Sequence, residues 1–503
     1  MTVVARLRPI CLSACWLVLA SCAVAPGERA HQPLDLPAAY VDVPLAAAGG
    51  GALAQQLHAP ELSVLLARAF AANPTLRQAW SRVERAEAVQ RQARAARLPQ
   101  LELSGEARRS RAPLFLPGQV GSPGGGGTAG AMATAPGGSA AGAVDADELA
   151  RSAFLRNQFE LGLGAGFEVD LWGRLRHSER AAALDAIAMR RDAESMAVTL
   201  AAEVALAWVD LAANRERGEL LAARRTTTRQ MLELTRMRFE QGQLPATEVH
   251  RQQQQLDALR AARTRNDAQR VQVANRLALL LGQPPRSAMQ IVQQAVPELP
   301  AVEPGAPADL LARRPDLRAA SLRLQAADLR VAASLAERLP ALRLNASVFD
   351  LAQQLGELFG ELFWSVGATA DISVFDGGRR RARHSQAEAT ATELLHEYAE
   401  LLLQALREVQ DALSLGRQQQ AFLEHTAAQL QGAERMAELA RRRFTAGSGD
   451  YLDVLGQRQR IHELGLELVD ARRELFALRL QLWRALGGGW AQQAGAGELT
   501  DER

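Results

Sequence analysis

Histidine, cysteine and paired carboxylates, the side chains that most often do chemistry, form no catalytic motif in this sequence. The run His396-Glu397-Tyr398-Ala399-Glu400 begins like the zinc-binding pattern H-E-x-x-H, but it ends in glutamate and falls inside a long helical stretch. The eight histidines show no metal-ligand spacing, and no Walker-type phosphate loop is present. We therefore predict no enzyme activity, no cofactor, no metal site and no direct use of nucleotide energy.

The charges of the chain nearly cancel. It carries 58 basic and 56 acidic residues, a net charge of +2, which argues against a nucleic-acid partner attracted by bulk charge. Glu203 and Glu408 occupy matching positions in two similar halves of the chain. They could line an internal passage or form surface salt bridges, and the salt-bridge interpretation is favoured.

The N-terminus resembles a bacterial lipoprotein signal. Arg6 and Arg8 precede an apolar run that is too short to span a bilayer and that ends in Leu19-Ala20-Ser21-Cys22. The pattern predicts removal of residues 1–21 and lipidation of Cys22. The similar pattern ending at Cys15 follows too little apolar sequence. A plain signal peptide is the alternative, and Ala23 after the cysteine favours sorting to the outer membrane.

The chain consists of two copies of one unit. "LWGRLR" (171–176) and "DGGRRR" (376–381) are separated by the same distance along the chain as "RFEQG" (238–242) and "RFTAG" (443–447). Corresponding motifs nearer the start of each copy are separated by a longer stretch of chain than these two pairs. The first copy therefore contains an insertion between its early and late motifs. The uncharged stretch "GSPGGGGTAGAMATAPGGSAAGA" (121–143) lies there, and its composition is typical of a disordered surface loop.

Each copy also predicts a β-hairpin and long helices. Residues 159–171 and 364–374 alternate between apolar and small or polar residues, which is typical of strands in membrane barrels. Residues 174–239 and 379–444 contain no proline, and each predicts a helix about 100 Å long at roughly 1.5 Å per residue. Return helices are expected at 246–281 and 450–486, with short helices at 74–97 and 315–338 stacked on their ends. The expected coiled-coil seam of the second return helix comprises Leu468, Ala471, Leu475, Leu478, Leu482 and Ala485.

Four strands with two open edges cannot stand alone in lipid, where no water satisfies the backbone. The chain is therefore expected to oligomerise into a closed barrel above a closed helical cylinder.

The sequence resembles the outer-membrane efflux factor family, which comprises the TolC-like proteins and their NodT-type lipoprotein branch. The resemblance rests on residues 170–174, 310–318, 375–379, 451–455 and 485–490. It implies a mainly α fold with two tandem repeats, a homotrimer with a twelve-stranded membrane β-barrel, and a periplasmic α-barrel. It also implies a periplasmic adaptor and an inner-membrane pump of the RND type as partners.

The resemblance places functional residues at both ends of the long helices. The strand–helix junctions would be Trp172, Gly173, Arg174, Gly377, Gly378 and Arg379, and the periplasmic tip turns would hold Arg238, Phe239, Gly242, Arg443, Phe444 and Gly447. The closing ring of the periplasmic gate would be built from Asp453, with Leu452 and Glu248. Gly456 replaces an acidic residue of many relatives, so this ring is expected to be weaker or single. The alternative is that Asp453 only caps the returning helix.

The expected domain organisation follows these elements. A signal peptide (1–21) and an extended, lipid-anchored segment (22–60) precede repeat 1 (61–283), whose hairpin carries an extracellular loop at about 107–155. An equatorial linker (284–312), repeat 2 (313–489) and a tail (490–503) follow. The predicted function is that of a passive outer-membrane exit duct for small toxic compounds. The alternatives are a channel for polypeptide secretion in the same fold, and a structural envelope lipoprotein without conductance.

Overall fold

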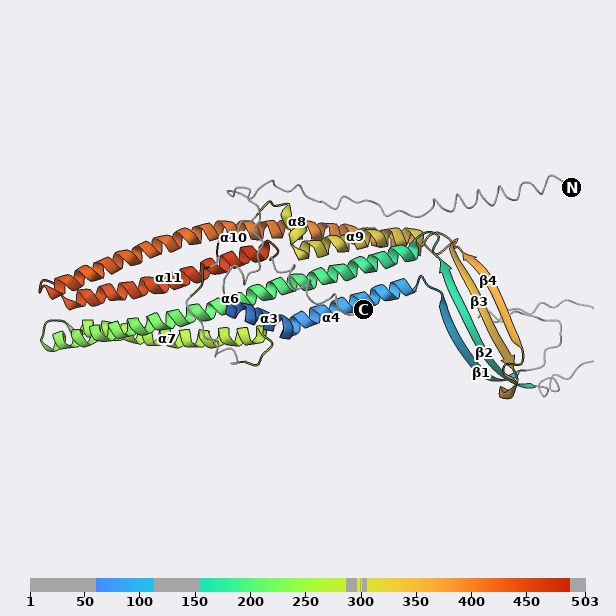
Figure 1. The fold of residues 1–503 in the computed structure, drawn as a ribbon, viewed down its shortest axis with the longest axis horizontal. Helices are drawn as coiled ribbons and strands as arrows, with labels where there is room; N and C mark the ends of the chain where they lie inside the picture. The colour runs from blue at the N-terminus through green and yellow to red at the C-terminus, as the bar shows by residue number, and fades with distance from the viewer. Residues whose placement is uncertain (1–59, 113–153, 286–295, 299, 301–304, 489–503) are drawn as a thin grey trace, which may run out of the picture. The chain divides into compact units, whose positions relative to one another are not determined.

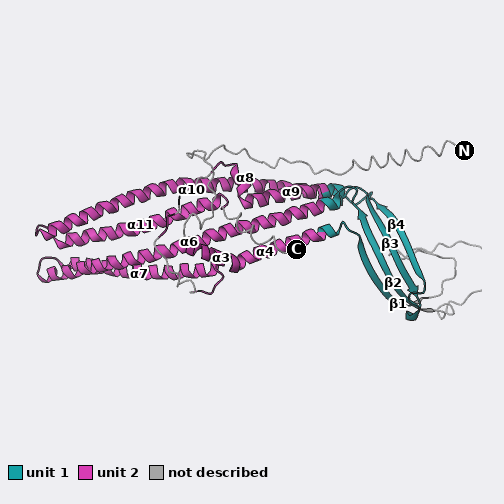
Figure 2. Cartoon of the chain, viewed as in Figure 1, with its two compact units in different colours: residues 1–24, 93–176, 333–380 teal, residues 25–92, 177–332, 381–503 magenta. Residues whose placement is uncertain are grey.

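The computed structural model describes residues 60–112, 154–285, 296–298, 300 and 305–488. Cys22, the glycine-rich insertion and the C-terminal tail lie outside the described residues. The described chain divides into two compact units (Figure 2). The first takes its residues from Ala93–Arg176 and Ala333–Arg380, and the second from the segments between and around them.

The first unit is built on one antiparallel sheet. Its strands are β1 (Gln100–Ala112), β2 (Phe154–Val169), β3 (Ala341–Ala352) and β4 (Leu362–Asp371), in the order β1-β2-β3-β4. The expected hairpins are therefore present and pair with each other. Two details of the expectation were wrong: the first hairpin continues to Ala112 and resumes at Phe154, inside the loop expected at 107–155, and β4 ends at Asp371, before the last alternating residues.

The second unit is helical (Figure 1). The predicted long helices are α6 (Arg174–Glu240) and α10 (Arg379–Thr445), each of 67 residues. The return helices are α7 (Ala246–Leu280) and α11 (Tyr451–Ala485), and the short helices are α4 (Pro74–Ala95) and α9 (Pro315–Ala336). These agree with the sequence prediction to within two residues. Two further helices, α3 (Pro60–Ala72) and α8 (Asp309–Arg313), precede α4 and α9.

The short helices stack on the ends of the return helices in the same way in both repeats. The Asn73 amide donates to the Leu280 carbonyl at 2.9 Å, and the Arg314 guanidinium donates to the Ala485 carbonyl at 3.2 Å. A glycine with a positive φ follows each return helix, Gly282 at 67° and Gly487 at 94°. A Cβ there would lie 2.5 Å and 2.7 Å from the facing backbone carbonyl oxygen, so only glycine permits the joint.

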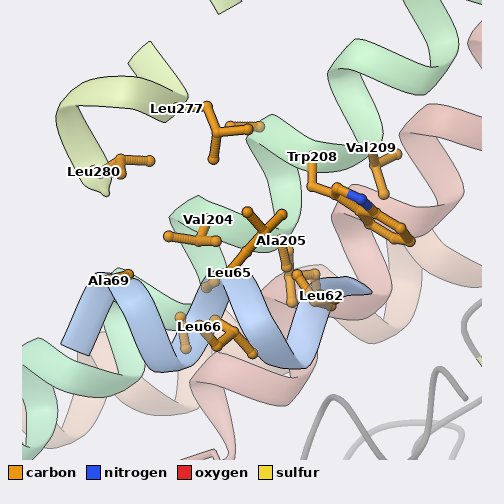
Figure 3. Close-up of a cluster of buried hydrophobic side chains, with 14 of the residues drawn as sticks. Leu62, Leu65, Leu66, Ala69, Val204, Ala205, Trp208, Val209, Leu277 and Leu280 are labelled. Carbon is orange, nitrogen blue, oxygen red and sulfur yellow. The ribbon is translucent and has the colours of Figure 1, made fainter. Parts of the chain in front are cut away.

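The main core lies where α3 packs against α6, α7 and α11. Leucines of α3 contact small and branched residues of α6 and the end of α7 (Figure 3). Alanines of α6, such as Ala201 and Ala205, are fully buried and allow the helices to approach closely. The six residues predicted as the α11 seam are all buried. One stretch of α6 has a mean hydropathy of 1.7 and passes the length and composition test for a membrane span, but 61% of it is buried inside the protein.

The two matching glutamates form ion pairs, as the sequence favoured. Glu408 binds Arg314 at 2.8 Å, and Glu203 lies 3.8 Å from Arg276. Arg314 is only 7% exposed and also binds Asp316 at 2.7 Å. Burial lowers the pKa of Arg314, but the hydrogen bonds and charges of Asp316 and Glu408 outweigh this effect and raise the pKa overall. Arg314 therefore stays charged, and it links the start of α9, through Asp316, to Glu408 in α10 and to the backbone carbonyl at the end of α11.

Candidate functional site

The sheet of the first unit has one apolar and one polar face. Directly opposed residues lie on the same face, so the strand register assigns every side chain. The polar face carries small and charged residues together with one stacked aromatic pair, Phe349 and Phe363, whose ring centroids are 5.7 Å apart. The apolar face includes Leu101, Leu103, Phe159, Leu161, Leu163, Phe167, Leu342, Leu344, Val348, Trp364 and Val366.

The outer strands of the sheet leave apolar side chains uncovered. β1 and β4 each pair on one side only within the described residues. Leu101 is 74% exposed on β1, and Trp364 is 75% exposed on β4. An apolar face with two open edges requires a non-aqueous surface and further strands to complete it.

The junctions between strands and long helices are fixed by carboxylates and glycines. Asp170 accepts hydrogen bonds from the backbone N–H groups of Leu175 and Arg176 at 3.1 Å and 2.8 Å, at the start of α6. Trp172 donates its indole N–H to the Pro340 carbonyl at 2.7 Å, which ties the β2 end to the β3 start. Gly173 has a φ of 80°, which a residue with a Cβ adopts rarely.

The second junction uses the same device. Asp376 accepts from the N–H groups of Gly378 and Arg380 at 3.0 Å and 3.2 Å, and Gly377 and Gly378 have φ values of 65° and 85°. Burial opposes ionisation of Asp376, but the backbone hydrogen bonds and the charges of Arg380 and Arg379 lower its pKa overall. Asp376 thus remains a carboxylate at the N-terminus of α10, where a negative charge is favourable.

The C-termini of the long helices α6 and α10 are followed by matching turns. Gly242 and Gly447 have φ values of 71° and 73° and donate to the carbonyls of Phe239 and Phe444 at 2.9 Å and 3.0 Å. The next residue in each turn donates to the carbonyl of Arg238 or Arg443 at 2.8 Å and 3.0 Å. These two backbone hydrogen bonds close the C-terminus of each long helix, and the chain reverses direction there. The predicted tip residues therefore lie in two equivalent turns.

One ion pair joins the tip of repeat 1 to the tip of repeat 2. Arg238 at the end of α6 binds both carboxylate oxygens of Asp450, which precedes α11, at 2.5 Å and 2.6 Å. The hydrogen bond raises the pKa of Arg238 and lowers that of Asp450. The sequence does not predict this contact, because Asp450 aligns with Pro245 in the first repeat and the repeat alignment therefore shows no symmetric pair.

The predicted gate residues lie beside this pair. Asp453 is exposed in the first turn of α11, Leu452 is half-buried, and the charge of Asp453 helps to raise the pKa of Arg238. The N-cap of α11 is Asp450, whose carboxylate accepts from the Leu452 N–H at 2.9 Å. The alternative in which Asp453 is the cap is therefore wrong. Glu248, the repeat partner of Asp453, forms an ion pair with Arg251.

No group of three or more metal-binding side chains comes together within the residues that the structure describes. The site thus consists of surfaces, junctions and turns. The chemical features of this site are the polar face of the sheet and the charged side chains at the tip turns of the long helices.

Comparison with known proteins decides what this architecture is. A model of the family described as outer membrane efflux protein matches residues 65–283 and 306–488, which is most of the chain. The chain belongs to this family. Its location in the outer membrane and its role in efflux follow from this membership, and so does its fold of long helices with a small share of strands.

Relatives of the chain carry names of the same kind. It is 28% identical over 502 residues to the outer membrane protein OprJ of Pseudomonas aeruginosa, covering 94% of each chain. It is 28% identical over 436 residues to the toluene efflux pump outer membrane protein TtgF of Pseudomonas putida, covering 86% of this chain and 84% of TtgF.

Solved structures share the fold. The outer-membrane channel OprN superposes with a TM-score of 0.78 at 25% identity, covering 93% of this chain and 100% of OprN. The outer membrane protein VceC of Vibrio cholerae superposes with a TM-score of 0.72 at 25% identity, covering 86% and 98%.

Proposed function

We propose that three copies of the chain form the exit duct of a tripartite efflux system. The observation that carries this proposal is the four-stranded sheet with an apolar face, a polar face and two open edges. In a bilayer the open edges leave backbone groups unsatisfied, so the sheet must close with other copies. Three copies give a twelve-stranded barrel, an even strand number of the size that membrane barrels use.

In this assembly the apolar face contacts lipid and the polar face lines a water-filled passage. The long helices extend the passage into the periplasm as an α-barrel. The duct is passive, and an inner-membrane pump of the RND type and a periplasmic adaptor supply energy and substrate. Small toxic compounds are the proposed cargo, in keeping with the name of the toluene efflux pump relative TtgF.

The test of this function is a deletion strain. We expect it to become sensitive to several small toxic compounds, and expression of the chain to restore resistance. A tagged chain should retain one adaptor and one pump after mild crosslinking. Loss of an exported polypeptide with unchanged susceptibility would instead indicate a secretion channel and would contradict the efflux proposal.

The periplasmic tips are the proposed gate. In a trimer, Asp453 and Leu452 from three chains converge on the narrow end, where three carboxylates repel one another and attract cations. Glu248 in the other tip turn is held by Arg251, so its charge is partly neutralised. The Arg238–Asp450 pair holds the two tips of each chain together and so keeps the ring closed.

Replacement of Asp453 by alanine is expected to raise conductance, reduce cation preference and sensitise cells to large antibiotics such as vancomycin. The reason is that the exposed carboxylate makes no cap, so its loss removes the ring charge without unfolding the turn. Single-channel recording and susceptibility assays measure the effect, and Glu434→Ala, which removes an exposed carboxylate from α10, is the control. Wild-type conductance of Asp453→Ala across pH and divalent-cation concentration would refute the gate assignment.

Cys22 is the proposed lipid anchor. Cys22→Ala behind a conventional cleavable signal should remove the lipid but leave assembled protein in the outer membrane, because the barrel itself holds the protein there. Mass spectrometry of the mature N-terminus measures the modification. An unmodified N-terminal peptide in the wild type would show that the anchor does not exist.

A further inference from the structure

Four charged side chains alternate in sign at the end of the sheet where the strands meet the helices. Arg174 donates to Glu168 at 2.7 Å, the other oxygen of Glu168 lies 3.8 Å from Arg343, and Arg343 lies 3.7 Å from Asp371. We call these four residues the charged girdle. A cavity of about 230 Å³ beside them is lined by Glu168, Arg174 and Arg343, among others.

The strand register places three girdle residues on the polar face. Glu168 is directly opposite Arg343 across β2 and β3, and Asp371 lies on β4 opposite Ala341, which has the same parity as Arg343. Arg343 and Asp371 are 56% and 57% exposed, whereas Glu168 is 20% exposed. The charges that face solvent are therefore those of Arg343 and Asp371, while Glu168 is largely neutralised by Arg174.

Carboxylates outnumber basic side chains on the polar face, among the strand residues whose side chains are described. Glu106 and Glu160 are directly opposite each other across β1 and β2, and Glu102 lies nearer the girdle. Among the strand residues whose side chains are described, Arg108 and Arg343 are the basic residues of this face, and Arg108 lies toward the hairpin turn. Among these described residues, Arg343 is thus the basic side chain at the helical end of the polar face, where carboxylates are in excess.

We propose that Arg343 sets the ion selectivity of the duct, by offsetting the carboxylates of the polar face so that anionic and zwitterionic solutes can pass as well as cations. This inference rests on the proposed function, because it requires the polar face to line the passage. In wild type the girdle has no net charge. Loss of Arg343 leaves one uncompensated negative charge per chain and three per trimer, all in a confined space where the potential reaches several kT.

The experiment is a reversal-potential measurement on the full-length protein in planar bilayers under a KCl gradient. Arg343→Gln is expected to raise the cation-to-anion permeability ratio about threefold, the effect of roughly half a kT of lumen potential, because a negative potential favours cations and disfavours anions by the same factor. Asp371→Asn should shift the ratio in the opposite direction, and Arg343→Lys should retain the wild-type value. Arg109→Gln is the matched control, because it removes the same charge from the apolar face, at a position opposite Asn157 and away from the girdle along the strands.

Each variant is measured in the wild-type background and with Arg238→Ala, so that closed periplasmic tips do not determine selectivity. A shift for Arg343→Gln but not for Arg109→Gln, in either background, supports the inference. Equal reversal potentials of these two variants in the Arg238→Ala background overturn it. Absence of any conductance in the wild type and in all variants would instead overturn the proposed function, so the two failures are distinct.

Discussion

Arg238→Ala is expected to open the periplasmic end and to raise the mean single-channel conductance several-fold. The substitution removes both hydrogen bonds to Asp450, which join the tips of the two repeats. Each side chain is about one-third exposed, so one pair contributes roughly 0.5–1 kcal/mol. Three pairs in a trimer then stabilise the closed state by about 1.5–3 kcal/mol, which corresponds to roughly a 10- to 150-fold change in the open population.

Reversal of the pair provides the control. Asp450→Ala should behave like Arg238→Ala, although it also removes the α11 cap. The double variant Arg238→Asp with Asp450→Arg should recover part of the closed state, because the pair can form again with its charges exchanged. Planar-bilayer recording at low and high salt measures these effects. If Arg238→Ala channels conduct like the wild type at low salt, the tips are held by other contacts.

Acidification should mimic these substitutions. The pKa of Asp450 is lowered below its ordinary value of 3.8, chiefly by the Arg238 hydrogen bond. The pair therefore contributes fully above that value, and its contribution is lost as the pH falls through the lowered pKa. Wild-type conductance should rise only below about pH 4, and Asp450→Asn should lose the part of this rise that comes from the pair.

Arg314→Ala is expected to destabilise the helical unit by about 3 kcal/mol, the largest stability loss that we predict for a charged residue. Arg314 is buried, and its removal strands the carboxylates of Asp316 and Glu408 and leaves the Ala485 carbonyl without its donor. Asn73→Ala is the matched comparison in the other repeat. It removes one donor and the helix cap to Leu76 and should cost about 1–2 kcal/mol.

Thermal unfolding followed by circular dichroism, together with the amount of protein in the outer membrane, measures this difference. Arg265→Ala, on the exposed surface of α7, controls for the loss of a positive charge. An Arg314→Ala protein that unfolds at the wild-type temperature, or that is more stable than Asn73→Ala, would show that the joint does not depend on Arg314.

The sequence predicts the periodic parts of the fold well. The boundaries of α6 and α10 agree with prediction because proline is absent within them and glycine turns follow them. The hairpins were predictable because the alternation that includes β2 and the one that includes β4 are long. β4 ends early because residues beyond Asp371 have no opposite partner on β3, whose first residue is Ala341.

The sequence does not predict the contacts between the two repeats or those between strands of different hairpins. The Arg238–Asp450 pair has no counterpart at the aligned positions, and Arg343 reaches Glu168 only through the pairing of one hairpin with the other. The sequence did not predict helix α3 as a separate element, because its apolar residues run without a polar boundary up to the Asn-Pro pair that precedes α4. Asp450, which the repeat alignment does not indicate, lies beside the predicted gate residues Asp453 and Leu452 and accepts a hydrogen bond from the Leu452 N–H.

The most direct test of the central claim is single-channel recording of the purified full-length protein, combined with its native mass in the same detergent. We predict a mass of three chains and discrete conductance steps on insertion into planar bilayers. A single-chain species that inserts, or a trimer that inserts without any conductance step even when Arg238 and Asp453 are both replaced by alanine, would contradict the account.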